Sequence, residues 1–194
     1  MLAALILVPV ALLPIAWFAP WYRVRSWLLP LAGAIHLLLV VLAMGSVPDA
    51  PPEAWVGLDP LSRLVLLAAS PLYLGCALYA VDYLEMRRDR GNRVMVPCLL
   101  AFLAALSLAA MARHLGLLWL ALEATTLASA PLIYYNRNRY SIEATWKYLL
   151  VCSVGIALAM LGLLFFAYAA LSGGAPVSLL LGDLLSAGPQ LSRP

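Results

Sequence analysis

Two ionisable side chains lie inside apolar stretches of this sequence, where a charge is costly and could serve to move protons. Glu123 is the one charged residue between Leu115 and Tyr135, a run of 21 residues. At ~1.5 Å of rise per residue its carboxylate lies about 12 Å from one end of that helix, near the middle of a ~30 Å hydrocarbon core. The carboxyl group must therefore be protonated, paired with a positive charge or hydrated, which makes it a candidate for ion translocation. The alternative is a polar contact that joins two helices.

Lys147 is the second such charge, a turn or two into the apolar run Thr145–Leu171. The connection from the preceding run is short, so the two helices are expected to pack antiparallel. The backbones of Glu123 and Lys147 then differ in depth by about 9 Å, so contact requires stretched side chains; a bridging water is the alternative. A carboxylate–ammonium couple in a wet channel has the physics of a proton relay. Otherwise Lys147 snorkels to the interface.

Neighbouring residues could serve this couple or compete with it. Glu143 lies four residues before Lys147 on the same face, so the two could pair locally, with Glu143 as a possible uptake carboxylate on the cytoplasmic side. Thr126 shares a face with Glu123. Its hydroxyl could bind a water, donate a hydrogen bond to the carboxylate, or bond back to its own backbone. Pro131 cannot donate to the carbonyl four residues earlier, which leaves an acceptor for water.

Two histidines and Arg63 are the remaining ionisable residues considered as candidates for the site. His36 lies near the middle of the run Trp27–Met44 and is either a proton relay or a neutral interhelical hydrogen-bonding group, with the second favoured. His114 is expected at the outer surface. Arg63, which stands close to Asp59, is expected to close a salt bridge at the outer rim.

The elements that must hold these residues are transmembrane helices. The chain has 194 residues, of which 65% are hydrophobic and only 11% charged, a balance that excludes a soluble domain. The alternation typical of a transmembrane barrel is absent. The sequence therefore predicts an all-α integral membrane protein, a bundle of six transmembrane helices within residues 1–171. The six apolar runs are Leu2–Phe18, Trp27–Met44, Leu61–Tyr83, Val94–Ala112, Leu115–Tyr135 and Thr145–Leu171.

The arginines predict the orientation of this bundle. The first, third and fifth connections between the runs carry eight of them, against Arg113 and Arg193 on the other side, with Arg63 just inside the third run. Since basic connections stay in the cytoplasm, both termini are expected on the non-cytoplasmic side. Residues 172–194 are expected to form an outer loop with a short interfacial helix over Val177–Ala187, and the chain is expected to be truncated before a seventh span. The eight are Arg23, Arg25, Arg87, Arg88, Arg90, Arg93, Arg137 and Arg139.

Redox chemistry within this chain has little support. Cys76, Cys98 and Cys152 lie in apolar runs without metal-ligand spacing, and they are interpreted as packing residues. There is no glycine-rich nucleotide loop, no CxxC and no histidine pair at haem spacing. The sequence thus predicts no cofactor and no metal; the expected partners are the lipid bilayer and protons or sodium ions, and no nucleic acid.

Two long strings match a known family in order and spacing. LGLLWLALEATTLASAPLIYYNRN, followed by SIEATWKYLLVCSVGIALAMLG, resembles the antiporter-like membrane subunits of respiratory complex I, Mrp-type sodium/proton antiporters and group 4 membrane hydrogenases. The segments EATTLASAPL and EATWKYLLVCSVGIALA are most similar to the F subunit of hydrogenase-4-type complexes. The resemblance covers roughly Leu58 to the end and is weaker over the first two runs.

The resemblance implies a function and a set of partners. Such subunits carry a glutamate on the fifth helix, here Glu123, and a lysine on the sixth, here Lys147, and take part in proton translocation driven by electron transfer elsewhere in a complex. This chain would then act in the plasma membrane with other membrane subunits of a hydrogenase or NADH–quinone-oxidoreductase-like assembly. Family members continue into a seventh helix with a central lysine, so the chain resembles their amino-terminal part. The alternative is a structural or assembly subunit, or a non-pumping fragment that only docks partner helices.

Overall fold

The computed structural model describes residues 1–51, 53–172 and 178–184, and its long elements are all α-helices. The predicted all-α class is confirmed, and each apolar run of the sequence corresponds to one helix. The helices are α1 (Leu2–Phe18), α2 (Tyr22–Ser46), α3 (Pro60–Met86), α4 (Met95–Met111), α5 (Leu115–Ile133) and α6 (Arg139–Ser172), with 3₁₀ turns η1 (Arg88–Arg90) and η2 (Tyr134–Asn136).

Four of these helices are long and apolar enough to cross a membrane. They are α2, α3, α5 extended through η2, and α6, as judged by length and composition. The chain is thus a multi-pass membrane protein. Helices α1 and α4 are apolar but each has 17 residues, about 25 Å of helix, somewhat less than the ~30 Å hydrocarbon core. The expected count of six spans therefore stays a prediction.

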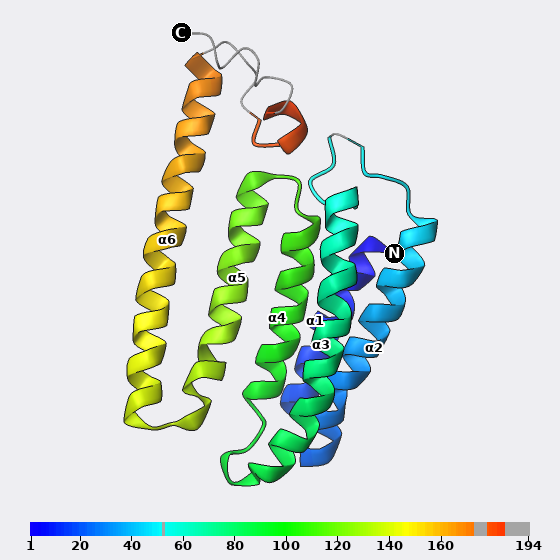
Figure 1. Cartoon of the computed structure of the whole chain (residues 1–194), viewed down its shortest axis with the longest axis vertical. Coiled ribbons are helices and arrows are strands. Elements are labelled where there is room, and N and C mark those ends of the chain that lie inside the picture. The colour runs from blue at the N-terminus through cyan, green and yellow to red at the C-terminus, as the bar shows by residue number, and fades with distance from the viewer. Residues whose placement is uncertain (52, 173–177, 185–194) are drawn as a thin grey trace.

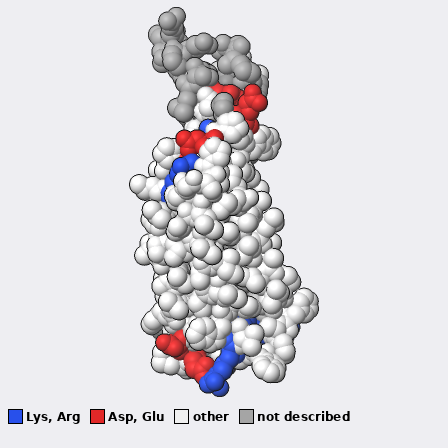
Figure 2. Space-filling model, turned by 90° about the vertical axis from the view of Figure 1, so that its right-hand side faces the viewer, with Lys and Arg blue, Asp and Glu red and all other residues white. Residues whose placement is uncertain are grey.

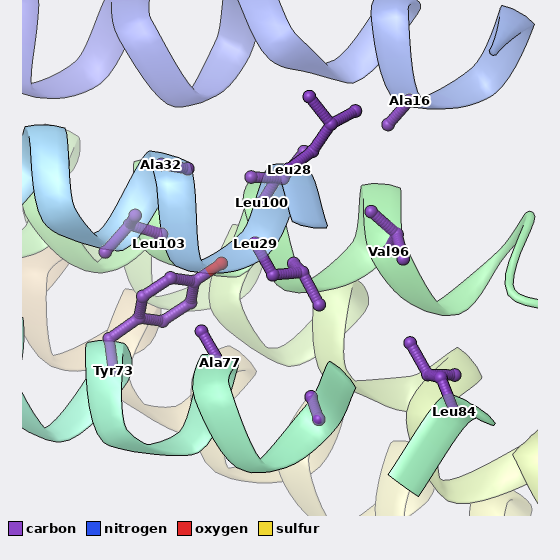
Figure 3. Close-up of a cluster of buried hydrophobic side chains, with 11 residues drawn as sticks. Ala16, Leu28, Leu29, Ala32, Tyr73, Ala77, Leu84, Val96, Leu100 and Leu103 are labelled. Carbon is purple, nitrogen blue, oxygen red and sulfur yellow. The ribbon is translucent and has the colours of Figure 1, made fainter. Parts of the chain in front are cut away.

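Most of the buried side chains lie among α1–α4. One apolar cluster joins these four helices around Leu29, Leu100 and Tyr73 (Figure 3). A second cluster includes Leu5, Val40 and Met111 and lies nearer the end of the bundle where α2 and α4 end. Both clusters contain small residues such as Ala32 and Ala43, which let helices approach closely where lipid supplies no hydrophobic driving force.

Helices α5 and α6 extend this bundle to one side. In Figure 1, α5 stands beside α4 and α6 stands beyond α5 at the edge of the molecule. Only Ala121 and Ala130 of α5 are buried. The most hydrophobic stretch of α6 has no buried residue, and Trp146, Leu150 and Phe165 are more than half exposed. The pair thus presents its outer surface to lipid or to another chain.

Charged side chains gather at the two ends of the bundle. On the face shown in Figure 2, a wide uncharged belt separates them. We call the end with the α1–α2 turn, the α3–α4 loop and the α5–α6 turn the basic end, because the eight arginines counted above lie at this end.

One of those arginines is buried in helix α2 and not in a loop. Arg25 is 9% exposed and donates to Asn92 Oδ1 at 2.9 Å and to the Ala19 carbonyl. Asn92 is fully buried and in turn donates to Ser26 Oγ at 2.8 Å and to the Tyr22 carbonyl at 2.9 Å. This network ties the α1–α2 turn to the α3–α4 loop, so Arg25 holds the bundle together in addition to adding positive charge.

Capping residues mark the starts of α3 and α6. Asp59 accepts from Ser62 N at 2.6 Å, with Pro60 in the first turn of α3, the pattern expected at an N-terminus. At α6, Asn138 and Ser141 bond each other reciprocally, N to Oγ at 2.9 Å and N to Oδ1 at 2.7 Å. This capping starts α6 at Arg139, six residues before the predicted start of the run, and reduces the connection to a tight turn.

The other end of the bundle is tied by backbone hydrogen bonds. Residues 111–115 bond to 55–57 on one side and to 179–181 on the other, through Gly57 N, Arg113 N, Leu115 N and Leu181 N. Residues 181–184 form one helical turn. The remainder of the expected interfacial helix, at 177 and 185–187, and the tail thought to be truncated lie outside the described residues.

Candidate functional site

Glu123 lies on α5, where its carboxylate has one buried oxygen without a hydrogen-bond partner. The residue is half-buried, and Oε2 contacts no donor among the residues that the structure describes. A buried polar oxygen without a partner is costly, and native proteins leave few of them unexplained. In the described part of the chain the arrangement is thus neither the salt bridge nor the single locked hydrogen bond expected of a purely structural glutamate.

Two side-chain contacts set the register between α5 and α6. Trp119 Nε1 donates to the Ile156 carbonyl at 2.9 Å, and Ser129 Oγ bonds Tyr148 Oη at 2.7 Å. Residue numbers rise along α5 as they fall along α6, so the helices are antiparallel, as predicted. Glu123 lies between the two contacts, four residues after Trp119 and six before Ser129.

Lys147 pairs with Glu143 and not with Glu123. Lys147 Nζ lies 2.5 Å from Glu143 Oε1, and the two side chains are 71% and 56% exposed. This is the local arrangement that the sequence left open. Lys147 adjoins Tyr148, which lies level with Ser129, so Lys147 is about six residues, or ~9 Å, nearer the basic end than Glu123.

Thr126 also takes the local alternative. Its hydroxyl donates to the Leu122 carbonyl at 3.2 Å, and Thr125 donates to the same carbonyl at 2.7 Å. Such back-bonding is common for threonine in helices. Pro131 lies inside α5, close to its end. In the described structure the Thr126 hydroxyl is therefore directed to its own helix and not to Glu123.

His36 belongs to a different group of helices. It is 1% exposed, and its ring nitrogens bond Ser70 of α3 at 3.0 Å and Ser107 of α4 at 2.8 Å. Ser107 donates its hydrogen to the Leu103 carbonyl, so it must accept from Nε2–H, and Nδ1 accepts from Ser70. The ring is thus a neutral Nε2–H tautomer that joins three helices, the interhelical arrangement that the sequence favoured.

Arg63 forms a salt bridge with Asp49 and not with the predicted partner, Asp59. Arg63 bonds Asp49 Oδ1 at 2.8 Å and the Val47 carbonyl at 2.8 Å. Asp59 instead caps α3, where its Oδ1 accepts from Ser62 N and Ser62 Oγ. Burial raises the pKa of Asp59, but hydrogen bonds from Ser62 and the charge of Arg113 outweigh this, and the pKa lies below its usual value.

His114 is half-buried at the end of the bundle opposite the basic end. Its ring stacks on Trp55 with 4.5 Å between centroids. The stack lies where residues 111–115 meet the α2–α3 loop, so it helps to close that end of the bundle.

Two polar contacts were missed by the sequence reasoning. Ser129 with Tyr148 joins α5 to α6 on the basic side of Glu123, and Asn92 organises the basic end. The available signal was a hydroxyl on each of two apolar runs, at positions that antiparallel packing brings level. For Asn92 in a polar loop, no comparable signal existed.

Comparison with known proteins identifies a distant relative. The Hydrogenase-4 component F homolog of Methylacidiphilum infernorum (isolate V4) is 28% identical over 157 residues, which cover 75% of this chain and 31% of the relative. This chain is a distant homologue of that protein and spans less than a third of its length. The resemblance to the F subunit of hydrogenase-4-type complexes is confirmed at this level. No family model and no solved structure matches the sequence.

Proposed function

We propose that this membrane subunit, a distant homologue of a hydrogenase-4 component F protein, takes part in proton translocation driven by electron transfer in partner subunits. Glu123 is the carboxylate that gains and loses the proton. The partners are other membrane subunits of a hydrogenase or NADH–quinone-oxidoreductase-like complex in the plasma membrane. The chain itself supplies no redox centre in this proposal.

The observation that carries the proposal is the unpartnered Glu123 Oε2 in the middle of an apolar helix. A structural glutamate at this depth would be stabilised by a donor on a neighbouring helix. An oxygen that keeps its bonding capacity can instead accept a water or a proton. Intramembrane carboxylates of this kind are expensive and typically functional.

Lys147 and Glu143 adjust the charge near this site. In this structure Glu143 neutralises Lys147, so the lysine attracts Glu123 only weakly. When Glu143 is protonated, Lys147 is released and its positive charge favours the ionised form of Glu123. Glu143 thus competes with Glu123 for the lysine, and proton arrival at one carboxylate affects the other. Thr126 donates to its own helix but keeps the lone pairs of its oxygen for a water, and Pro131 leaves the carbonyl four residues before it as a second acceptor for water.

The topology proposed for this function has six spans. The even number places both termini on the non-cytoplasmic side, with the basic end in the cytoplasm, and the concentration of arginines at one end supports this orientation. Helices α1 and α4 span a locally thinned bilayer or lie inside a larger assembly, where short helices are tolerated.

The test is Glu123→Gln in membranes that hold the assembled complex. We expect redox turnover and assembly to persist while proton uptake per electron falls to background, because glutamine cannot ionise. Glu53→Gln, the same chemical change at an exposed loop position, should leave proton uptake unchanged. Sodium-free and sodium-containing buffers distinguish H⁺ from Na⁺ as the transported ion.

Two outcomes would refute the proposal. One is normal proton uptake by Glu123→Gln. The other is loss of assembly without any change in uptake by the complex that does form, which would favour the structural alternative for this chain.

A further inference from the structure

The contact surface between α5 and α6 has two chemically different halves. Toward the basic end, the hydroxyl of Ser129 on α5 bonds that of Tyr148 on α6, and Thr145 adds a hydroxyl on α6 that donates to the Ser141 carbonyl of its own helix. Toward the other end lies a cavity of about 140 Å³ with an apolar lining. The cavity is lined by Leu115, Leu118, Trp119, Leu122, Ile156, Ala159 and Leu163.

Helix periodicity places these residues on two facing stripes. On α6, Thr145, Tyr148, Cys152, Ile156 and Ala159 follow one another at spacings of three or four residues, so they share a face. All but Ala159 are half-buried, in contrast to the exposed residues between them, such as Val151 and Val154. Figure 1 shows α5 and α6 side by side along this line. The stripe changes from polar to apolar along its length.

Glu123 lies where this change occurs. It shares a face with Trp119, four residues before, and with Thr126, three residues after. Trp119 lines the apolar cavity, whereas Thr126 is three residues from the hydroxyl of Ser129. In the register set by the two α5–α6 contacts, Glu123 is level with Cys152 and its neighbours. The carboxylate is thus the innermost ionisable group of the polar half.

The Tyr148–Ser129 contact has a defined direction. Ser129 Oγ donates its one hydrogen to the Thr126 carbonyl at 2.9 Å. It must therefore accept from the Tyr148 hydroxyl. The phenol oxygen keeps its lone pairs free to accept from a water on the basic side. The two hydroxyls form a bridge across the contact surface, between the Glu143–Lys147 pair and Glu123.

We propose that protons reach Glu123 from the basic end along this polar half, through the Tyr148–Ser129 hydroxyl bridge, and that the apolar half closes the route to the opposite end. A hydronium ion next to Glu123 transfers its proton to the carboxylate and leaves a water, so charge and atoms balance. Tyr148 and Ser129 are positioning residues that orient this water. The inference rests on the proposed function of Glu123 as the proton acceptor.

The route is tested first by thiol labelling, which does not depend on transport. Chains with a single thiol are exposed to a charged, membrane-impermeant methanethiosulfonate from either side. Cys76→Ala and Cys98→Ala leave the native Cys152 as that thiol, and Thr145→Cys and Ala159→Cys are each made with Cys152→Ala added. Thiols react as thiolates, which need water, so we expect Cys152 and Thr145→Cys to react from the basic side about tenfold faster than Ala159→Cys from either side. Equal rates, or an inert Cys152 and Thr145→Cys, would overturn the route.

The bridge is tested by Tyr148→Phe, which keeps the ring and removes the hydroxyl. We expect proton uptake to slow about tenfold or more, as for loss of a positioned proton-transfer group, with a larger solvent deuterium isotope effect. Tyr140→Phe is the matched control, because it makes the same chemical change on α6 at a side chain that is 80% exposed, and it should leave the rate and the isotope effect unchanged.

The outcomes separate the route from the function. Slowing of both variants to the same extent would show an effect not specific to the bridge and contradict it, as would a normal rate in Tyr148→Phe. If Glu123→Gln abolishes proton uptake but thiols in the polar half label no faster than thiols in the apolar half, the proposed function is supported and the proposed route is refuted. If labelling follows the polar half while Glu123→Gln pumps normally, the proposed function falls.

Discussion

The four helices α1–α4 and the pair α5–α6 differ in how tightly they pack and in whether their polar groups have hydrogen-bond partners. In α1–α4, leucines and alanines interlock and polar residues such as His36 and Asn92 have partners on neighbouring helices. In α5–α6 the contact surface is narrow, few residues are buried, and Glu123 keeps an oxygen without a partner. Regions that must change protonation state need unfilled bonding capacity and room for water, whereas the regions that support them do not.

The largest expected effect contrasts a buried leucine of α4 with an exposed leucine of α6. Leu100 is fully buried, whereas Leu158 is 63% exposed. Leu100→Ala should lower the free energy of unfolding by about 2–5 kcal/mol, since it opens a cavity in packed surroundings. Leu158→Ala should change it by less than about 0.5 kcal/mol. Unfolding in detergent micelles measures both; equal effects would show that α6 is packed as tightly as α4.

The next effect concerns His36, which we expect to act in stability and not in transport. Interhelical hydrogen bonds in membrane proteins contribute about 0.6 kcal/mol on average and up to 1–2, so His36→Leu should lower the free energy of unfolding by about 1–2 kcal/mol. Proton uptake should persist, in contrast to Glu123→Gln. A loss of uptake at unchanged stability would instead establish His36 as a relay.

A smaller effect is expected at the start of α3. Asp59→Ala removes a cap and should lower the free energy of unfolding by about 1 kcal/mol at neutral pH. The folded-state pKa of Asp59 lies below its ordinary value, so its contribution is present above about pH 4 and is lost as the pH falls through the folded value. Thermal unfolding at pH 7 and about pH 3 measures this. A difference between variant and parent that persists at low pH would contradict the role of the charge.

The smallest effect is expected for the exposed ion pair of α6. Exposed pairs four residues apart contribute little to stability. Lys147→Gln should therefore leave the thermal midpoint unchanged, within the error of the measurement, and so should Glu143→Gln. A clear drop in the midpoint for either variant would show that this face of α6 is packed against something else in the membrane.

Periodicity and composition were sufficient to predict the helices, because a membrane-spanning segment is either a helix or a barrel strand and a long, continuous apolar run lacks the alternation of a barrel strand. The start of α6 was missed, since Asn138 and Ser141 cap each other across a turn that reads as a polar loop. The position of Glu123 was predictable from counting along α5. The partner of Lys147 was not, since Glu143 and Glu123 are both within plausible reach and only the direction of the side chain decides between them.

The tight turn between α5 and α6 also bears on biogenesis. Only a short η2 turn and a reciprocal cap lie between them, so we expect the two helices to form one hairpin as they leave the ribosome. We expect the insertion machinery to release them laterally as a unit. Leaving together would shield the carboxylate of one arm behind the hydroxyls of the other during passage into the bilayer, so that a residue which hinders insertion of a lone helix becomes tolerable in a pair.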